Sequence, residues 1–375
     1  MIIPLLNYLL LFIVPLIVVP GLDLRFEPPK VLVAELLIQA IVGYAILTGK
    51  FAFKRVSRPL AVIIGGLFLL SLLHLILNPT VQNLFGNIFR LQGTVLFWHL
   101  LALALITQNI YFRLSSKYVY MCAFIAICAG GPVYGSNNAG RWIGSLGEPN
   151  AYGAVVVLIF PFVFLSFKEI WVRVLAVLTA LLVIYFTESR SAFVGLGLGL
   201  LFLLGLKLTK SNYLLASITC VILLLASLTL PVIDRVYFLR TNTDPYAFRF
   251  EDRAEIWQVA VAAGLESPVY GMGLESIQSQ IKTTAQKMNV NSQYQTIDSS
   301  HNLLLDVWIW GGSLGLILLL TLIVVTFKNL IRKRMTLELA VFLGLLTVLS
   351  FNPTTVPVLA GFWWVIGRSF AKIES

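Results

Sequence analysis

Long runs of apolar residues, separated by short polar loops, account for most of this chain. A helix needs roughly 20 mostly apolar residues to cross the hydrocarbon core of a bilayer. Twelve runs meet or approach that length, so the pattern predicts an all-α polytopic membrane protein with about twelve transmembrane helices in a single domain, residues 1–375. The predicted spans are residues 2–20, 31–49, 59–78, 93–111, 116–133, 151–167, 170–187, 191–206, 213–231, 303–327, 337–351 and 354–370.

One long polar stretch interrupts this pattern between about Pro231 and His301. Residues 232–300 are therefore predicted to form a loop outside the hydrocarbon core. Within it, Asp252 and Glu255 have the spacing of a capping box, which predicts a helix that begins there. A membrane protein that keeps one sizeable hydrophilic segment is expected to place its chemistry in or beside that segment.

A second helix is predicted further along this loop, from about Leu274 to Met288, where apolar residues recur at helical spacing. Lys282 and Lys287 fall on the opposite face, which makes the helix amphipathic. Such a helix lies on a membrane surface, covers a binding site or simply packs as a lid, and the sequence leaves these alternatives open.

The composition agrees with a membrane protein. Only 12% of the residues are charged, 58% are hydrophobic and the mean hydropathy is +0.89. A soluble domain carries about twice that share of charged residues. The net charge of +10 does not indicate a nucleic-acid partner, because the basic residues lie in short clusters beside the lipid bilayer. No Asp-x-Asp, His-Glu-x-x-His or Cys-x-x-Cys pattern occurs, so no metal or cofactor is predicted.

The basic residues are distributed unequally between the two sides of the predicted topology. Sixteen of the 27 lie in loops after even-numbered spans and in the C-terminal tail, against five in the short loops on the other side. Because basic residues mark cytoplasmic loops, both termini are predicted to be cytoplasmic and the 232–300 loop to face outward. No ATP or nucleotide sugar is supplied there, so a transferase needs an already activated donor, which favours a lipid-linked one.

Four arginines lie in outward-facing loops beside polar or helix-breaking residues: Arg90, Arg141, Arg190 and Arg253. A lone arginine at such a place is more often an interfacial anchor that snorkels to water. Four together, on the side that should be depleted of basic residues, predict an anion site. Arg253 falls in a first helical turn, where free backbone N–H groups suit a phosphate. Arg190 lies in a tight turn between two spans, at the depth of lipid headgroups.

His301 is the only histidine outside the predicted spans. An unperturbed imidazole titrates near pH ~6.5, so it can accept a proton from a hydroxyl at neutral pH. A lone histidine is more often structural, but its place beside an arginine-rich stretch favours catalysis. Asp306 follows on a helix face near the outer boundary, where a charged residue is expected to have a polar partner or a functional role.

The order of the short motifs resembles the O-antigen ligase and polymerase superfamily of bacterial membrane glycosyltransferases. The motifs are Arg-x-x-Gly at 90–93, Gly-Glu-Pro-Asn at 147–150, Ser-Arg-Ser at 189–191, Asp-Arg-x-x-x-Trp at 252–257, Pro-Val-Tyr-Gly-Met-Gly at 268–273, His-Asn-x-x-Leu at 301–305 and Gly-Gly-x-x-Gly at 311–315. Each motif alone is weak, whereas their order and spacing are fairly specific over residues 85–327. The chain differs from typical ligases in Glu148, where Asn is common, and it lacks the large C-terminal domain of many protein-directed members.

The resemblance implies a GT-C-like fold and an inverting, metal-independent glycosyl transfer in the bacterial cytoplasmic membrane. The implied donor is a glycan on undecaprenyl diphosphate. The essential histidine of the family maps to His301, and its two diphosphate-contacting arginines map to Arg190 and Arg253. Further candidates for the site are Arg90, Arg141, Asn150, Asp252, Asn302 and Asp306.

The acceptor is less well defined by the resemblance. A ligase transfers to lipid A–core or a similar glycolipid, a polymerase to another lipid-linked repeat unit, and some relatives to proteins. We favour a ligase-like reaction, in which His301 deprotonates or orients the acceptor hydroxyl. A polytopic transporter is the alternative from another class, but transporters place polar residues at the bilayer midplane, often in repeated halves. Here the polar residues lie at outer ends, without an evident repeat.

Overall fold

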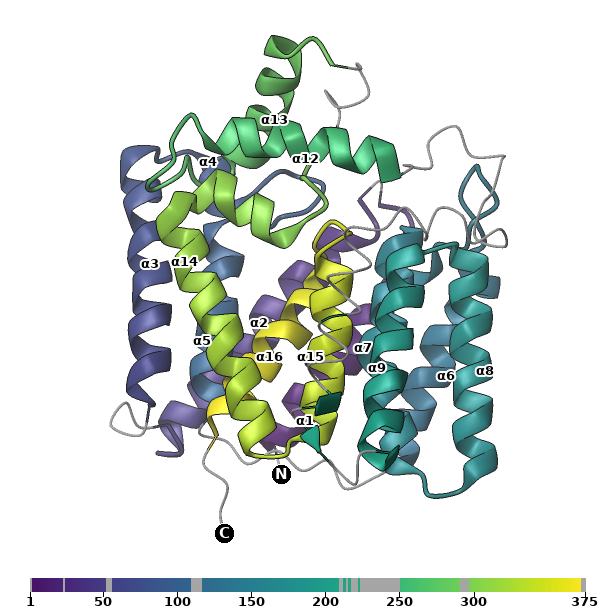
Figure 1. Ribbon diagram of the computed structural model, residues 1–375. Helices are drawn as coiled ribbons and strands as arrows, with labels where there is room; N and C mark the ends of the chain where they lie inside the picture. The colour runs from purple at the N-terminus through teal and green to yellow at the C-terminus, as the bar shows by residue number, and fades with distance from the viewer. Residues whose placement is uncertain are drawn as a thin grey trace.

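The computed structural model describes residues 2–22, 24–51, 56–108, 117–208, 212–213, 215–216, 222, 250–290 and 297–371. Throughout these ranges the regular structure is helical (Figure 1). The elements are α1 (Ile2–Tyr8) with its continuations η1 (Leu9–Ile13) and η2 (Val14–Leu16), α2 (Glu27–Leu47), α3 (Arg58–Leu77), α4 (Val81–Phe85), α5 (Thr94–Thr107), α6 (Lys117–Tyr134), η4 (Gly144–Leu146), α7 (Pro149–Ser166), α8 (Ile170–Thr187), α9 (Arg190–Leu208), α12 (Phe250–Gly264), α13 (Ser276–Lys287), α14 (Leu303–Arg332), α15 (Thr336–Leu349) and α16 (Val356–Phe370).

The helices confirm the predicted all-α class. Six of the described helices are long and apolar enough to cross a membrane: α2, α3, α6, α7, α8 and α14. Shorter apolar helices occupy five more predicted spans, at α1 to η2, α5, α9, α15 and α16. The predicted span at 213–231 lies mostly outside the described residues. The total of twelve spans and the likeness to GT-C folds therefore stay predictions.

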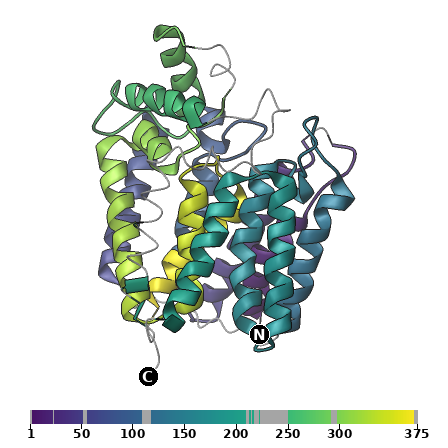
Figure 2. The ribbon, with the colours of Figure 1, turned by 45° about the vertical axis from the view of Figure 1, so that its right-hand side comes forward.

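The polar loop and the N-terminus lie at opposite ends of the helical bundle (Figures 1 and 2). In Figure 1, α4, α12 and α13 cover the top of the bundle, while the chain begins at the bottom, where α16 also ends. This arrangement agrees with a topology in which the long loop and both termini are on different sides of the membrane. Which side is cytoplasmic stays a prediction from the basic residues.

The centre of the bundle is formed by α7, α15 and α16, whose side chains are mostly buried. Tyr152 on α7 shows how a polar group is accommodated there. Its hydroxyl lies 2.8 Å from the carbonyl oxygen of Cys128, and Pro132 has no N–H to bond that oxygen within α6. The same hydroxyl accepts a bond from the Gly131 N–H at 3.0 Å. Tyr152 thus replaces the main-chain hydrogen bond that α6 loses at Pro132.

The loop segment between α12 and α13 is joined to α14 through a break at Gly312, where φ is 58° and ψ is −157°. Main-chain groups that the break frees bond to the loop: Met272 N–H donates to the Ile309 carbonyl at 3.1 Å, and Ser313 N–H donates to the Pro268 carbonyl at 2.8 Å. A Cβ atom at position 312 would lie 2.6 Å from the Val269 carbonyl oxygen. Only glycine therefore fits this junction without distortion.

The amphipathic helix α13 packs against protein in this structure. Ile281 and Ala285 are fully buried in a small hydrophobic cluster with Ile256 and Val259 of α12 and Ile309 of α14. Met288, expected on the same apolar face, lies just past the helix end and is 42% exposed. One face of α13 therefore packs against α12 and α14, and the alternatives that the sequence left open stay open.

Lys30 fixes the start of α2 against two neighbouring loops. Its side chain is fully buried, and the ammonium donates to the carbonyl oxygens of Ile17 at 2.6 Å, Phe26 at 2.9 Å and Ser145 at 2.7 Å. Three main-chain acceptors match the three N–H bonds of a lysine. This buried cation is therefore structural, although the sequence places it at an outward-facing loop.

We expect Lys30→Met to destabilise the protein, because three carbonyl oxygens, one buried and two partly buried, would lose a charged donor, at a cost of about 3 kcal/mol or more. The measurement is the apparent Tm of the purified protein in detergent. Lys168→Met is the control, since Lys168 is exposed beyond the end of α7. Equal Tm values for the two variants would show that the Lys30 contacts contribute nothing.

Candidate functional site

His301 lies on a tight turn that leads into α14. Its φ of +57° is left-handed, and its main-chain N–H donates to the Ser299 hydroxyl at 3.2 Å. Asn302 is the N-cap of α14, and its side-chain oxygen accepts from the N–H groups of Leu304 at 3.0 Å and Leu305 at 3.4 Å. The helix begins at this cap, so His301 lies in the turn just before the first residue of α14.

Asp306 holds this turn in place. The buried carboxylate accepts two bonds from Ser300, one from the main-chain N–H and one from the hydroxyl, both at 2.7 Å. The sequence predicted either a polar partner or a functional role for Asp306, and the structure supplies the partner. Asn302 and Asp306 therefore hold the turn that carries His301.

The pKa of His301 is lowered to about 4, first by burial of the imidazole and then by the positive charge of Arg253. Asp298 opposes this shift, and Arg90 adds to it. The imidazole is accordingly neutral at neutral pH, which leaves a ring nitrogen able to accept a proton. The same electrostatic couplings place His301 near Arg253 and also near Asp298 and Arg90.

Arg253 in the first turns of α12 is surrounded by further positive charge. Burial, followed by the nearby charges of Arg190 and Arg141, lowers its pKa to about 10, while Glu148 opposes the shift. The Nε atom of Arg253 is buried without a hydrogen-bond partner. A buried, incompletely bonded guanidinium among two other arginines is a site that an anion would stabilise.

Arg190 and Arg141 reach this corner from other helices. Arg190 is the first residue of α9 and follows Glu188, whose φ is +52°. Arg141 donates to the Thr187 carbonyl at 2.9 Å and to the Asn150 side-chain oxygen at 3.2 Å, and these contacts aim it along the start of α9. The structure thus brings together the predicted residues Arg141, Asn150, Arg190 and Arg253.

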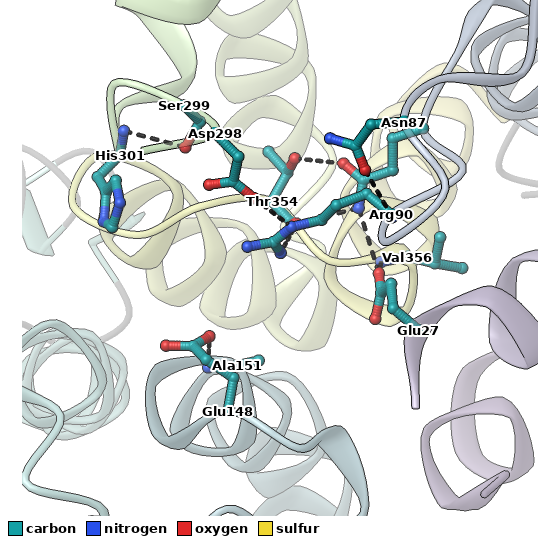
Figure 3. A network of polar contacts seen from close by, with 11 residues as sticks. Glu27, Asn87, Arg90, Glu148, Ala151, Asp298, Ser299, His301, Thr354 and Val356 are labelled. Atoms are coloured by element: carbon teal, nitrogen blue, oxygen red, sulfur yellow. Dashed lines mark hydrogen bonds and ion pairs between the residues drawn. The ribbon is translucent and has the colours of Figure 1, made fainter. Parts of the chain in front are cut away.

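The fourth predicted arginine, Arg90, lies beside Asp298 and Thr354 (Figure 3). Its Nε donates to Asp298 at 2.6 Å, and a terminal nitrogen donates to the Thr354 carbonyl at 3.1 Å. Burial alone would lower the Arg90 pKa, but the carboxylates of Asp298, Glu27 and Glu148 outweigh it and raise the pKa. The guanidinium of Arg90 is therefore already bonded to protein groups.

Glu27 extends this network to the start of α2 (Figure 3). Its carboxylate accepts from the Val356 N–H at 2.7 Å and from the Gln92 amide at 3.2 Å. Gln92 also bonds Thr354 twice, at 2.7 Å and 3.0 Å. These contacts join four loops. The sequence did not predict Glu27, Gln92, Asp298 or Thr354 as part of the site. Each is a single polar residue far along the chain from its partner, so no local pattern reveals the pairing.

A cavity of about 850 Å³ opens beside the network, beneath α13. Arg90, Asp298, Ser299 and Thr354 form its edge nearest His301. The rest of the wall comes from the end of α3, the 78–92 segment and residues 266–282. Arg141, Arg190, Arg253 and His301 do not belong to the described lining, so the cavity lies beside the turn that carries His301 and does not include the arginine corner.

The predicted role of Asp252 and the predicted independence from metal stay predictions. The side chain of Asp252 and residues 223–249 and 291–296 of the loop are outside the described residues. Among the residues that are described, no group of three or more His, Cys, Asp or Glu side chains could hold a metal ion. Independence from metal stays a prediction about the reaction.

Fold and site together indicate a polytopic membrane protein with a histidine close to an arginine corner and to a polar cavity. Residues 174–320 match the model of a family described as O-antigen ligase. This match supports the resemblance to the O-antigen ligase and polymerase superfamily that the order of the motifs predicted, and the apolar helices agree with a membrane protein. The matched segment, less than half of the chain, contains Arg190, Arg253 and His301 but not Arg90 or Arg141. A comparison with curated proteins finds no match.

We expect Asp306→Ala to destabilise the His301 turn by about 2 kcal/mol or more, because Ser300 would keep a buried N–H without an acceptor. Asp306→Asn retains one acceptor oxygen and should lose less. The measurement is again the apparent Tm in detergent. A loss of the same size in both variants would contradict the proposed role of the carboxylate oxygen in holding Ser300.

Proposed function

We propose that this protein is an inverting, metal-independent glycosyltransferase that moves a glycan from undecaprenyl diphosphate to an acceptor hydroxyl outside the cytoplasmic membrane. The observation that carries the proposal is Arg253, whose buried guanidinium lies among other arginines with its Nε unpaired, next to a neutral His301. The match to the O-antigen ligase family over this segment supports a ligase-like reaction.

The arginine corner suits a diphosphate leaving group. Arg190 and Arg253 are close enough for each charge to affect the other, and Arg141 adds a third. A diphosphate diester would relieve this repulsion and fill the unused bonding capacity of Arg253. The corner lies at the loop end of the bundle, where a lipid headgroup would lie if that end faces outward (Figure 1).

His301 suits the role of general base. The acceptor hydroxyl loses its proton to a ring nitrogen of His301 while its oxygen bonds the anomeric carbon. The bond between that carbon and the diphosphate oxygen breaks, and undecaprenyl diphosphate leaves with the electron pair. The arginines stabilise the charge that develops on it. Asp298, which raises the pKa of His301, favours the imidazolium that forms.

Replacement of His301 by Ala should lower kcat by roughly 10²-fold or more, the usual contribution of a general base. Initial rates with purified protein and a lipid-linked donor measure this effect. Binding of the donor should remain within a few-fold of wild type, because the arginines are unchanged. Near-normal turnover in the variant would rule out the proposed base.

The pH dependence of kcat/KM, which reports on the free enzyme, should differ from that of kcat, which reports on the enzyme with bound donor. His301 must be deprotonated to act, so the rate is lost as pH falls through its pKa. In the free enzyme burial and Arg253 lower that pKa, and the acid limb of kcat/KM should lie below the usual ~6.5 of histidine. A bound diphosphate offsets the arginine charge, so the acid limb of kcat should lie at higher pH. Coincident limbs, or limbs unchanged in His301→Ala, would contradict this assignment.

Arg253→Met should raise the KM or the dissociation constant for the donor at least about tenfold, because a charged hydrogen bond to phosphate is lost. Arg332→Met is a matched control, since Arg332 is an exposed arginine in the last turn of α14, at the other end of the bundle. An equal effect of the two substitutions would show that Arg253 does not contact the anion.

A further inference from the structure

The cavity beside His301 has the size of a binding site and is not used by the diphosphate. Its volume of about 850 Å³ lies within the range of roughly 300–1,000 Å³ that is usual for small-molecule pockets. The diphosphate assigned above belongs with Arg190 and Arg253, neither of which lines the cavity. A second substrate of comparable size therefore has room beside the turn that carries His301.

Side-chain amides form a large part of the polar wall of this cavity. An amide both donates and accepts hydrogen bonds, as does the hydroxyl of a sugar. Ser276, Ser279 and Ser299 add hydroxyl groups, and Tyr270 adds an aromatic ring that is 49% exposed. The amides are Asn78, Gln82, Asn87, Gln92, Gln278 and Gln280.

Two polar side chains at the wall retain bonding capacity. His74 is 4% exposed, and neither ring nitrogen makes a well-aligned hydrogen bond, although main-chain groups of Tyr270 and Gly271 lie near it. The Gln280 side-chain oxygen is also buried without a partner. Buried polar atoms are nearly always bonded, so these two indicate that a hydrogen-bonding ligand completes the cavity.

The charges on the wall disfavour an anionic ligand. Arg90 is already paired with Asp298, which leaves Lys282 as the other lining cation within the described residues. Glu266 is paired with Lys287, which does not line the cavity, so Glu275 and Asp306 are the lining acids without a described ion pair, against Lys282. A phosphate on the ligand would meet these carboxylates without the arginine cluster that usually binds it.

We propose that this cavity binds the end of the acceptor, and that this end is a glycan without phosphate or other anionic groups. The proposal rests on the glycosyl transfer proposed above. An inverting displacement brings the attacking hydroxyl to the face of the sugar opposite its leaving group. The turn that carries His301 contributes Ser299 to the cavity wall, and the charges of Arg253, Asp298 and Arg90 all act on the imidazole, so the histidine lies near both the cavity and the arginine corner.

Binding measured without any donor tests this proposal. The probes are fluorescently labelled oligosaccharides of neutral hexose and N-acetylhexosamine units, together with singly phosphorylated forms of the same chains. The full-length protein in detergent should bind at least one neutral chain more tightly than its phosphorylated form. Tighter binding of the phosphorylated forms, or no binding of any chain, would overturn the proposal.

Two variants locate the binding in the cavity. Gln278→Lys places a cation on the wall, and the affinity for the phosphorylated chain relative to the neutral one should increase about tenfold. Gln286→Lys is the matched control on the same helix, since Gln286 is exposed and outside the cavity lining. Tyr270→Ala should weaken binding of the neutral chain about tenfold, through loss of ring contact with the sugar. Equal preference in both lysine variants would also overturn the proposal.

The outcome is separable from that of the proposed reaction. If neutral chains bind as expected but His301→Ala keeps its activity, the catalytic assignment is wrong and the glycan site stands. If His301→Ala is inactive but neutral chains do not bind, the reaction stands and the acceptor assignment is wrong.

Discussion

The geometry of the site depends on a buried carboxylate at the start of α2. Glu27 accepts bonds from the main chain of Val356 and from Gln92, and so joins the first long helix to loops from the second and last parts of the chain. An unpaired carboxylate would cost several kcal/mol in such surroundings. Arg90 provides a nearby compensating charge and extends the constraint to Asp298, two residues before the turn that holds His301. The position of the histidine therefore depends on helices remote in sequence.

Both turns that carry the principal side chains have unfavourable backbone conformations. His301 and Glu188, two residues before Arg190, each have a left-handed φ without being glycine. Such residues cost about 1–3 kcal/mol each and persist only where surrounding contacts hold them. Here Asp306 fixes the first turn through Ser300, and Arg141 bonds the carbonyl of Thr187 beside the second. The strain, and the clustering of like charges around Arg253, are stabilised by the rest of the fold.

Hydrophobic periodicity was enough to locate the helices, because crossing a bilayer demands long apolar segments. Residue chemistry and the family resemblance together predicted His301, Arg190 and Arg253 as site residues, and the structure brings them to one end of the bundle. Sequence could not reveal Glu27, Asp298 or the amide-lined cavity. Those features arise from single residues whose partners lie up to several hundred positions away, and glutamine and asparagine side chains form no motif. Asp306 was noticed for its charge, but its role in holding Ser300 became evident only from the turn.

The break in α14 at Gly312 has a consequence for how this protein can diversify. Because main-chain bonds fix residues 268–273 to the broken helix, that junction is independent of the side chains that follow it. The segment from 274 to 290 contributes much of the cavity wall, whereas the arginine corner comes from α9, α12 and the 135–144 segment. Under the proposed function, substitutions in α13 would change the accepted sugar while the proposed donor site is inherited intact, so that recognition and catalysis would evolve at different rates within one chain.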